Sequence, residues 1–327
     1  MPTKDLSSTQ LKSVTLSQID TADDTYRITT RTNVDDLLPS ISHDGVLNPP
    51  IVIEKSAQFT IVSGFRRITA CKKLGFEEMT VRALQPDLNP LEYLRIAIAD
   101  NTLQRPIDLI EASRSLHKLS VHLSTRQRLI EFASSLGLPS NPAVIKKIKD
   151  LCLLPQRIQN ALMTDTLSLS MAMDLKKLPP ACAVAFTRLF DEFKLSLNKQ
   201  REIMTLVKEI ARRDSISEQK VLEDPQLQGI ILDRDLDRGQ KAQQLRAFLR
   251  QRRFPRIVKA ETIFEYQRKQ LNLGNEIKII PPKDFEGTTY TVAMSFSSID
   301  QLKALHAKLD QMIKHPSLKK IIEREDK

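Results

Sequence analysis

The sequence changes character at Pro90, and this change limits how the chain can fold. Before Pro90, short runs rich in β-branched residues alternate with helix-like segments, and Gly45, Gly64 and Gly75 separate them. After Pro90, glycine is sparse and apolar residues recur at helical spacing as far as about Arg213. We therefore expect a mixed α/β segment followed by a mostly helical one.

The mixed segment is expected to contain three strands and two helices. Residues up to about Ser13 are polar, and we expect them to be loosely held. Asn33 is placed to cap the first helix and Gly45 to end it. Gly64 separates a strand from the second helix, which Gly75 ends. The expected helices cover residues 34–42 and 65–74, and the expected strands cover 51–54, 59–63 and 79–84.

Two short helices joined by a tight turn lie between residues 126 and 154. The first, residues 129–136, stops at Gly137. The second begins at Pro142, with Ser140 or Asn141 as its cap. We expect Val144, Ile148 and Leu151 to face inward, and Lys146, Lys147 and Lys149 to face outward.

This pair of helices is typical of a helix–turn–helix, whose second helix enters the DNA major groove. Many helical hairpins share the pattern, so a plain helical bundle stays open as the alternative, and the basic charge favours DNA binding. Lys146 and Lys147 are then expected to contact phosphate. The complete predicted DNA-binding set is Ser140, Asn141 and Ala143 nearest the base edges, with Lys146, Lys147 and Lys149.

The chain has 327 residues, a net charge of +10 and a pI of about 9.5. This excess of lysine and arginine favours an anionic partner, nucleic acid before an acidic membrane, although plain solubility accounts for it as well. Cys71, Cys152 and Cys182 form no CxxC pair and lie in apolar settings, where a free thiol acts as a small core residue. We find no secretory leader and no apolar run of membrane-spanning length, and expect a cytoplasmic protein.

Two charged stretches follow the helical segment. Residues 214–240 lack clear periodicity, so we expect a linker there. From Lys241 to Lys259, positive charge gathers without a single acidic residue. A solvated helix face and contact with a phosphate backbone are both open, and the missing acids favour phosphate contact.

The C-terminal segment is expected to form a small β-β-α unit. Residues 276–280 and 289–296 have strand-like patterns, and Ser298 can cap a helix that follows. Alternate residues of the second strand, Tyr290, Val292, Met294 and Phe296, share one face. A unit this small buries little area by itself. We therefore predict that residues 265–327 form a homodimerisation module.

Arg66 and Arg67 follow Gly64 at the start of an expected helix. A helix N-terminus carries about half a positive charge, so two arginines there are unfavourable unless an anion joins them. Free backbone N–H groups, a glycine and two guanidinium groups make a good phosphate site. The alternative, that both side chains extend into solvent, stays open on spacing alone.

Residues 34–84 resemble the N-terminal domain of the ParB family of DNA-partition proteins. Residues 99–113 resemble the second nucleotide motif of that family, residues 126–179 its helix–turn–helix domain, and residues 273–309 its C-terminal dimer domain. The matching positions include Leu38, Ser40, Ile41, Gly45, Val46, Pro50, the box of Gly64, Arg66 and Arg67, and the pair Leu74 and Gly75.

The resemblance implies an α+β multidomain protein. Its parts are a mixed α/β ParB/sulfiredoxin-like N-terminal domain, an all-α helix–turn–helix middle domain and a small β-β-α dimerisation domain. The expected boundaries are 14–107 for the first domain, 108–213 for the second, 214–264 for a basic linker and helix, and 265–327 for the third.

The resemblance also implies a dimeric clamp on double-stranded DNA, gated by CTP with Mg²⁺, nucleoid-associated, and able to recruit a ParA-type ATPase. Carried over by position, Gly64, Arg66 and Arg67 hold the triphosphate, and Asn101 and Arg105 complete the pocket. Asp100 or Asn101 then lies near the metal.

Two positions depart from the family pattern. Phe65 stands where the family has glutamate, and three residues instead of two separate Asn101 from Arg105. Asp100 replaces a glutamate and is one methylene shorter, which can misplace an activated water. We therefore expect nucleotide binding and leave a weak CTPase activity open. No long basic N-terminal stretch, of the kind that stimulates the ATPase partner, is present.

Two other function classes stay open. One is a ParB-derived transcriptional regulator that has lost nucleotide chemistry. The other is a nuclease-like enzyme on the same N-terminal fold, for which the sequence offers no cluster of His, Cys or Asp at metal-ligand spacing.

Overall fold

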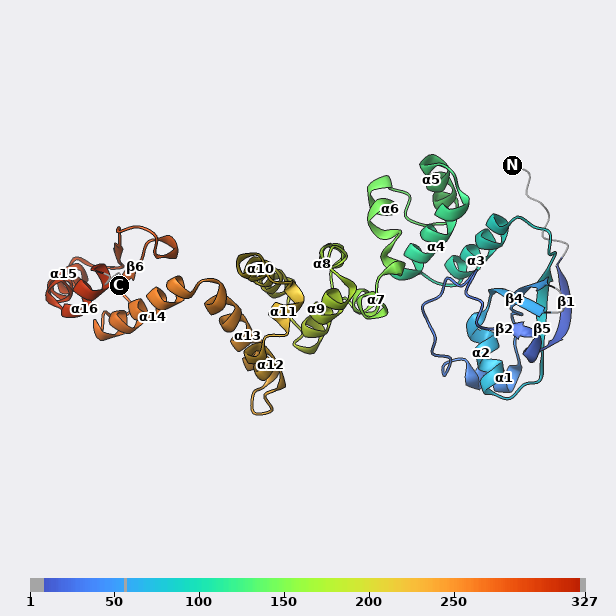
Figure 1. Cartoon of the computed structure of the whole chain (residues 1–327), viewed down its shortest axis with the longest axis horizontal. Helices are drawn as coiled ribbons and strands as arrows, with labels where there is room; N and C mark the ends of the chain where they lie inside the picture. Colours follow the sequence, from blue (N-terminus) through green and yellow to red (C-terminus); the bar gives the residue numbers. More distant parts are fainter. Residues whose placement is uncertain (1–8, 56–57, 324–327) are drawn as a thin grey trace. The chain divides into compact units, whose positions relative to one another are not determined.

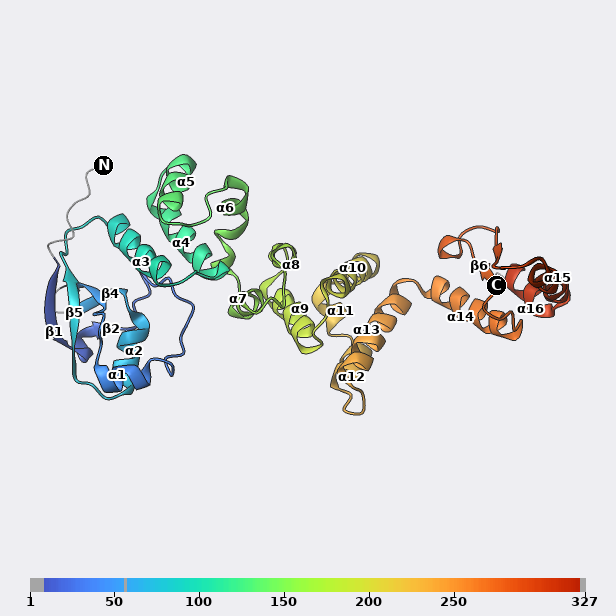
Figure 2. The same cartoon turned by 180° about the vertical axis from the view of Figure 1, so that it is seen from behind.

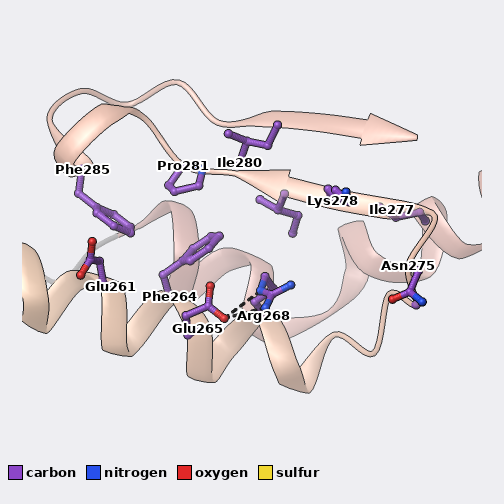
Figure 3. A pocket seen from close by; sticks show the side chains of 12 residues that line it. Glu261, Phe264, Glu265, Arg268, Asn275, Ile277, Lys278, Ile280, Pro281 and Phe285 are labelled. Atoms are coloured by element: carbon purple, nitrogen blue, oxygen red, sulfur yellow. Dashed lines mark hydrogen bonds and ion pairs between the residues drawn. The ribbon is translucent and has the colours of Figure 1, made fainter. Parts of the chain in front are cut away.

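The chain forms two compact units, residues 1–191 and 192–327. A computed structural model describes residues 9–55 and 58–323. Figure 1 and Figure 2 show that the first unit begins with a sheet and continues as helices, and that the second is helical with a short pair of strands near its end. The expected α+β class is confirmed.

The first unit contains a five-stranded mixed sheet with the order β1-β5-β3-β4-β2. β1 is antiparallel to β5, β3 is antiparallel to β4, and the pairs β3–β5 and β2–β4 are parallel. The strands are β1 (Gln10–Thr15), β2 (Ile19–Asp20), β3 (Ile51–Lys55), β4 (Gln58–Ser63) and β5 (Glu78–Leu84). The three strands predicted from β-branched runs are therefore confirmed.

The prediction that the chain is loose as far as Ser13 is wrong for residues 10–13. These residues pair with β5, from Gln10 opposite Ala83 to Ser13 opposite Thr80. Only Val14 of β1 is buried, because β1 lies at the edge of the sheet. Backbone hydrogen bonds hold such a strand, so its polar sequence gives little sign of it. Residues 1–8 lie outside the described part of the chain.

Helices α1 (Leu38–Asp44) and α2 (Phe65–Lys73) share one apolar core with the sheet. Ile41, Ile68 and Cys71 are buried in this core. The first helix begins later than predicted, because the Asn33 side chain accepts a hydrogen bond from the Asp35 N–H (2.8 Å) and forms a turn instead of a cap. Gly45 and Gly75 follow the two helices with positive φ, as expected.

The rest of the first unit is helical. Its long helices α3 (Pro90–Gln104) and α4 (Leu109–His122) confirm that the chain becomes helical after Pro90, and α3 packs against β4. Asp108 and Glu111 form a reciprocal capping box that starts α4. The remaining elements are the 3₁₀ turns η2 (Leu16–Gln18) and η3 (Leu151–Leu153), and α5 (Arg126–Ser135), α6 (Pro142–Ile148), α7 (Gln156–Met163), α8 (Leu169–Leu175) and α9 (Pro180–Glu192).

The second unit begins with α10 (Leu197–Asp214), whose apolar face, Ile203, Leu206, Val207 and Ile210, is buried. The linker expected at 214–240 contains two helices instead, α11 (Glu218–Leu222) and α12 (Pro225–Leu232). Ser217 and Asp224 cap them, and Val221, Leu222 and Leu227 are buried. Helices this short complete too few turns to show a clear period in the sequence.

The C-terminal part contains α13 (Arg238–Arg253), α14 (Pro255–Gln270), β6 (Ile277–Ile280), the 3₁₀ turn η4 (Lys283–Phe285), β7 (Thr291–Met294), α15 (Ile299–Lys314) and α16 (Pro316–Ile322). The two strands pair antiparallel, from Ile277 opposite Met294 to Ile280 opposite Thr291, and Ser298 caps α15 as predicted. Within residues 9–55 and 58–323, no helix combines the length and the apolar character that a bilayer crossing requires.

Candidate functional site

The candidate site begins at the corner where β4 gives way to α2. Gly64 has φ +97° and ψ 21°, a left-handed conformation that glycine adopts without strain. A Cβ at this position would lie 2.8 Å from the Cβ of Pro50 and 2.9 Å from its Cα. Close approach to Pro50 therefore demands glycine here, independently of the backbone angles.

Arg66 lies in the first turn of α2 and points back over the chain before α1. Its Nε donates to the carbonyl of Asn33 (3.0 Å), and its Nη2 donates to the Asp36 carboxylate. The hydrogen bond from Arg66 lowers the pKa of Asp36. Asp36 itself is mostly exposed.

Arg67 is held on the other side of the same corner. Its Nη1 donates to the carbonyl of Asn48, and its Nη2 lies 3.5 Å from the Asp100 carboxylate. Burial lowers the pKa of the Arg67 guanidinium, and Asp100 opposes that effect. Asp100 also accepts hydrogen bonds from the Ser63 hydroxyl and from Gln104 (3.0 Å).

Both arginines are therefore held against the protein. Their side chains are only 22% (Arg66) and 18% (Arg67) exposed, so the alternative that they extend into solvent is wrong. The first turn of α2 contains no acidic residue, and the compensating carboxylates, Asp36 and Asp100, come from segments distant in sequence. The corner combines two guanidinium groups, one exposed carboxylate and the N-terminus of a nine-residue helix.

Asn101 and Arg105 make different interactions. The Asn101 amide donates to the carbonyl of Ala97 one turn earlier (2.7 Å). Arg105 binds Glu111 with two hydrogen bonds, of 2.7 and 2.5 Å. The structure thus brings together Gly64, Arg66, Arg67 and Asp100 but engages Asn101 and Arg105 elsewhere.

Glu111 is the most deeply buried carboxylate near the site, with 0% of its side chain exposed. Burial by itself would raise its pKa, but hydrogen bonds from Arg105 and from the N–H groups of Asp108 and Thr30 outweigh burial and lower the pKa to about 2. Glu111 therefore stays ionised and joins α4 to the segment before α1.

Phe65, the residue that departs from the family box, is buried in the core of the sheet and α2. The guanidinium of Arg27 lies over its ring, 5.4 Å from the centroid. Arg27 is not among the residues predicted from the sequence, and neither are Asp36 and Ser63, which bond Arg66 and Asp100. Only Ser63 had a signal in the sequence, because it ends a predicted strand directly before Gly64.

The residues predicted to lie near a metal do not form a metal site by themselves. Asp100 already bonds Ser63 and Gln104, and Asn101 bonds the backbone. Within the described ranges, no group of three or more His, Cys, Asp or Glu side chains is placed to hold an ion. A magnesium ion here would depend on oxygens of a bound phosphate for most of its coordination.

The helix–turn–helix is formed by α5 and α6. Asn141 caps α6 by accepting hydrogen bonds from the N–H groups of Ala143 (2.9 Å) and Val144 (3.3 Å). Lys146 and Lys147 are exposed, as expected, together with Asn141 and Ala143, whereas Ser140 and Lys149 are half-buried.

The prediction that Val144 faces inward is wrong, because its side chain is 39% exposed. Ile145 and Ile148 are the buried residues of α6, and Leu138 from the turn is buried beside the hairpin. The helix is thus rotated by about one residue from the predicted face, and the predicted Leu151 is buried beyond its end.

The basic segment 241–259 has acidic partners after all. Arg246 pairs with Glu202 (2.7 Å), Arg250 with Glu261 (2.5 Å) and Arg253 with Glu209 (2.7 Å), and Arg252 pairs with Asp224 (2.7 Å) and Asp214 (3.1 Å). The missing acids therefore do not favour phosphate contact, since α10, α12 and α14 and their ends supply carboxylates to these arginines. This face is better explained as packing between helices than as a phosphate-binding surface.

Comparison with known proteins matches residues 2–102 to the ParB N-terminal domain family. This part of the chain is therefore similar to the N-terminal domain of ParB proteins. The chain is 30% identical over 137 residues to the nucleoid occlusion protein of Geobacillus sp. WCH70, which covers 41% of this chain and 46% of that one. It is also 30% identical over 134 residues to the stage 0 sporulation protein J of Bacillus subtilis 168, covering 41% and 45%. The chain thus spans just under half the length of these curated relatives.

Among solved structures, two of the ParB protein from Caulobacter crescentus are similar. The C-terminally truncated form complexed with CTP-γ-S has 23% identity and a TM-score of 0.26, over 56% of this chain and 99% of that one. The form complexed to the centromeric parS site has 21% identity and a TM-score of 0.32, over 58% and 96%.

Proposed function

We propose that this chain is a sequence-specific DNA-binding protein of partition or nucleoid organisation, which works as a dimeric clamp gated by a nucleoside triphosphate. The match to the ParB N-terminal domain and the basic helix–turn–helix support DNA binding. The observation that carries the nucleotide-gated part is the α2 corner, where Gly64, Arg66 and Arg67 surround a helix N-terminus.

The corner supports phosphate binding by charge exchange. Asp36 is exposed, and an exposed ion pair contributes little free energy, so a phosphate can replace it beside Arg66 at small cost. Arg67 is less exposed than Arg66, and its partner Asp100 lies inside the corner. Free N–H groups of the first turn of α2 add hydrogen bonds to a phosphate oxygen. Arg66 thus binds the anion, and Arg67 positions it.

Arg105 is proposed to stay on Glu111 when nucleotide binds. Removing one partner from a buried charge pair costs about 3–5 kcal/mol, which outweighs the gain from one further phosphate contact. Asn101 can reach a ligand only after releasing Ala97. Mg²⁺, where it binds, would take Asp100 as its protein ligand alongside phosphate oxygens, and it would neutralise phosphate charge.

The remaining parts of the proposal concern partners. Lys146 and Lys147 of α6 contact the DNA backbone, Ala143 and Asn141 lie at the base edges, and the C-terminal β6–β7 module joins two copies. Nucleoid association in the cytoplasm and a ParA-type ATPase partner follow from the family and belong to the same proposal.

Calorimetry with CTP and Mg²⁺ tests the nucleotide site. We expect the full chain to bind CTP and Arg66→Ala to weaken binding by about 1.5–3 kcal/mol, the cost of losing a hydrogen bond to a charged group. Lys73→Ala is the matched control, since it removes one positive charge from the last turn of the same helix and should bind as the unaltered chain does.

Absence of CTP binding by the unaltered chain would favour the second candidate, a ParB-derived DNA-binding regulator without nucleotide chemistry. Two observations favour this alternative specifically: Phe65 is a core residue in place of the family glutamate, and both arginines already pair with carboxylates. A nuclease-like activity has no such support.

A further inference from the structure

A second concave surface lies in the first unit, away from the α2 corner. It has a volume of about 650 Å³ and three walls: the segment 24–32, helix α4, and η3 with the start of α7. None of Gly64, Arg66, Arg67, Asn101 or Arg105 is among its described lining residues. Its size is that of a small-molecule pocket.

The charge of this pocket is predominantly positive. Arg27 projects from the first wall and Arg114 and Lys118 from α4, whereas Asp24 is the lining carboxylate. Arg27 pairs with Asp24 (3.2 Å). Within residues 9–55 and 58–323, no carboxylate lies within ion-pair distance of Arg114 or Lys118. Two positive charges therefore share one pocket without direct compensation.

Backbone oxygens hold these two cations in place. Lys118 Nζ donates to the carbonyls of Asp24 (2.8 Å) and Thr25 (2.7 Å), and Arg114 Nη1 donates to the carbonyl of Thr29 (2.8 Å). Lysine has three N–H donors and arginine five, so both side chains keep donors beyond these bonds. Burial lowers the pKa of Lys118, Asp24 opposes this, and Arg114 lowers the pKa further. An anion in the pocket would relieve the cost of keeping both groups charged.

We propose that this pocket binds a small phosphate-bearing anion, with Arg27, Arg114 and Lys118 as its cationic contacts. The anion joins α4 to the segment before α1, because its contacts come from both. Arg27 also lies over Phe65, the second residue of the α2 corner, so the anion pocket borders the proposed nucleotide site without sharing its residues. Free pyrophosphate and the phosphates of a nucleotide share this chemistry.

Cys152 offers a probe in the unaltered full chain. It lines the pocket and is half-buried, whereas Cys71 and Cys182 are buried. Alkylation at Cys152, followed by peptide mass spectrometry, measures access to the pocket. The rate of alkylation by negatively charged iodoacetate, divided by the rate with neutral iodoacetamide, should be higher at Cys152 than for free cysteine. Added salt should lower this ratio, because it screens the positive charge of the pocket.

Pyrophosphate is the first ligand probe. At ten times its dissociation constant it should slow iodoacetamide alkylation of Cys152 about tenfold, because only the unoccupied fraction reacts. CTP is the second ligand probe. If CTP protects Cys152 at a lower concentration than pyrophosphate does, the ligand is a nucleotide. If both protect at the same concentration, the pocket recognises the phosphate groups alone. No protection by either at millimolar concentration, with no preference for iodoacetate, overturns the proposal.

Variants separate this pocket from the α2 corner. Lys118→Gln should lose the protection and the iodoacetate preference, and Lys146→Gln on α6 is the control that should keep both. Arg66→Ala should also keep both, whatever it does to CTP binding in calorimetry. If Arg66→Ala removes the protection, or Lys118→Gln retains it, the second pocket is not an anion site, and the proposed nucleotide site is judged separately by calorimetry.

Discussion

At the scale of single residues, the contact between Arg105 and Glu111 has the largest predicted energetic consequence. It joins the end of α3 to the first turn of α4, and Glu111 also receives the Thr30 N–H at 3.1 Å. The resemblance to the ParB family predicted that Arg105 lines the nucleotide pocket. The six-residue spacing between Arg105 and Glu111 gives no indication of a buried ion pair. Such a contact depends on how α4 turns away from α3, which only the fold reveals.

This pair predicts how stability changes with pH. The folded pKa of Glu111, about 2, lies below its ordinary value of 4.5, so the unfolded chain binds the proton more tightly. Its contribution, on the order of 3 kcal/mol, is complete above about pH 4.5 and is lost as the pH falls toward 2. Urea denaturation from pH 7 to 2.5 should show this loss in the unaltered chain and a weaker pH dependence in Glu111→Gln.

Glu92→Gln is the control for that experiment. Glu92 also pairs with an arginine, Arg95, but the two side chains are 43% and 39% exposed, whereas that of Glu111 is fully buried, so losing the pair should cost under about 0.5 kcal/mol. Equal pH profiles for Glu111→Gln and the unaltered chain would contradict the assigned pKa.

Gly64 and Gly75 form a natural pair for a second prediction. Both have positive φ, but a Cβ would meet Pro50 at Gly64 and nothing within 4 Å at Gly75. Gly75→Ala should therefore cost only the left-handed strain, roughly 1–2 kcal/mol. Gly64→Ala should cost roughly 1–3 kcal/mol more, because the new methyl group overpacks the corner. Thermal denaturation measures the difference, and equal losses would mean that Pro50 moves aside.

At the scale of elements, the sequence predicted what periodic or β-branched patterns report. It located β3, β4, β5, α2 and the strands of the C-terminal module, and it showed that the chain becomes helical after Pro90. It missed β1, whose pairing rests on backbone bonds, and the short helices α11 and α12. It also predicted the wrong buried residue in α6, because Val144 and Ile145 are adjacent apolar residues and only packing decides which one is buried.

Helix α6 carries a DNA-binding prediction. Lys146→Ala with Lys147→Ala should weaken DNA binding and reduce the slope of log affinity against log salt by about 2, since each phosphate contact contributes close to one. Fluorescence anisotropy with the DNA that co-purifies with the protein provides the measurement. An unchanged slope would remove α6 from the DNA interface.

Arg250→Ala with Arg253→Ala is the matched control, because it also removes two positive charges. These arginines pair with Glu261 and Glu209, so we expect the salt slope to stay the same and thermal stability to fall. A reduced slope in this variant would restore the basic segment as a DNA contact.

At the scale of the whole molecule, the C-terminal part leaves apolar side chains uncovered. Phe296 is 54% exposed, and Val292 and Ile299 are also exposed. The sequence predicted the alternation that includes Val292 and Phe296, but it did not show which of these side chains the rest of the chain covers. Exposed apolar groups in one small region favour a protein partner.

We expect this region to join two copies of the chain. Val292→Glu with Phe296→Glu should convert a dimer into a monomer in sedimentation of the full protein, because charges cannot be desolvated in an apolar interface. Val121→Glu is the control, since it places a charge on an exposed apolar residue of α4 in the first unit, 70% exposed. A chain that sediments as a monomer before any substitution would disprove the dimer.

The helix before the C-terminal strands has a practical consequence for anyone who dissects this protein. Phe264 of α14 is buried with Ile277, Leu305 and Ile321, and its ring lies 5.7 Å from that of Phe285. A fragment that starts at residue 265 therefore lacks the buried Phe264 ring and begins in the middle of α14. A fragment that starts at Pro255 keeps Phe264 and the whole of α14, so it is the fragment to express first.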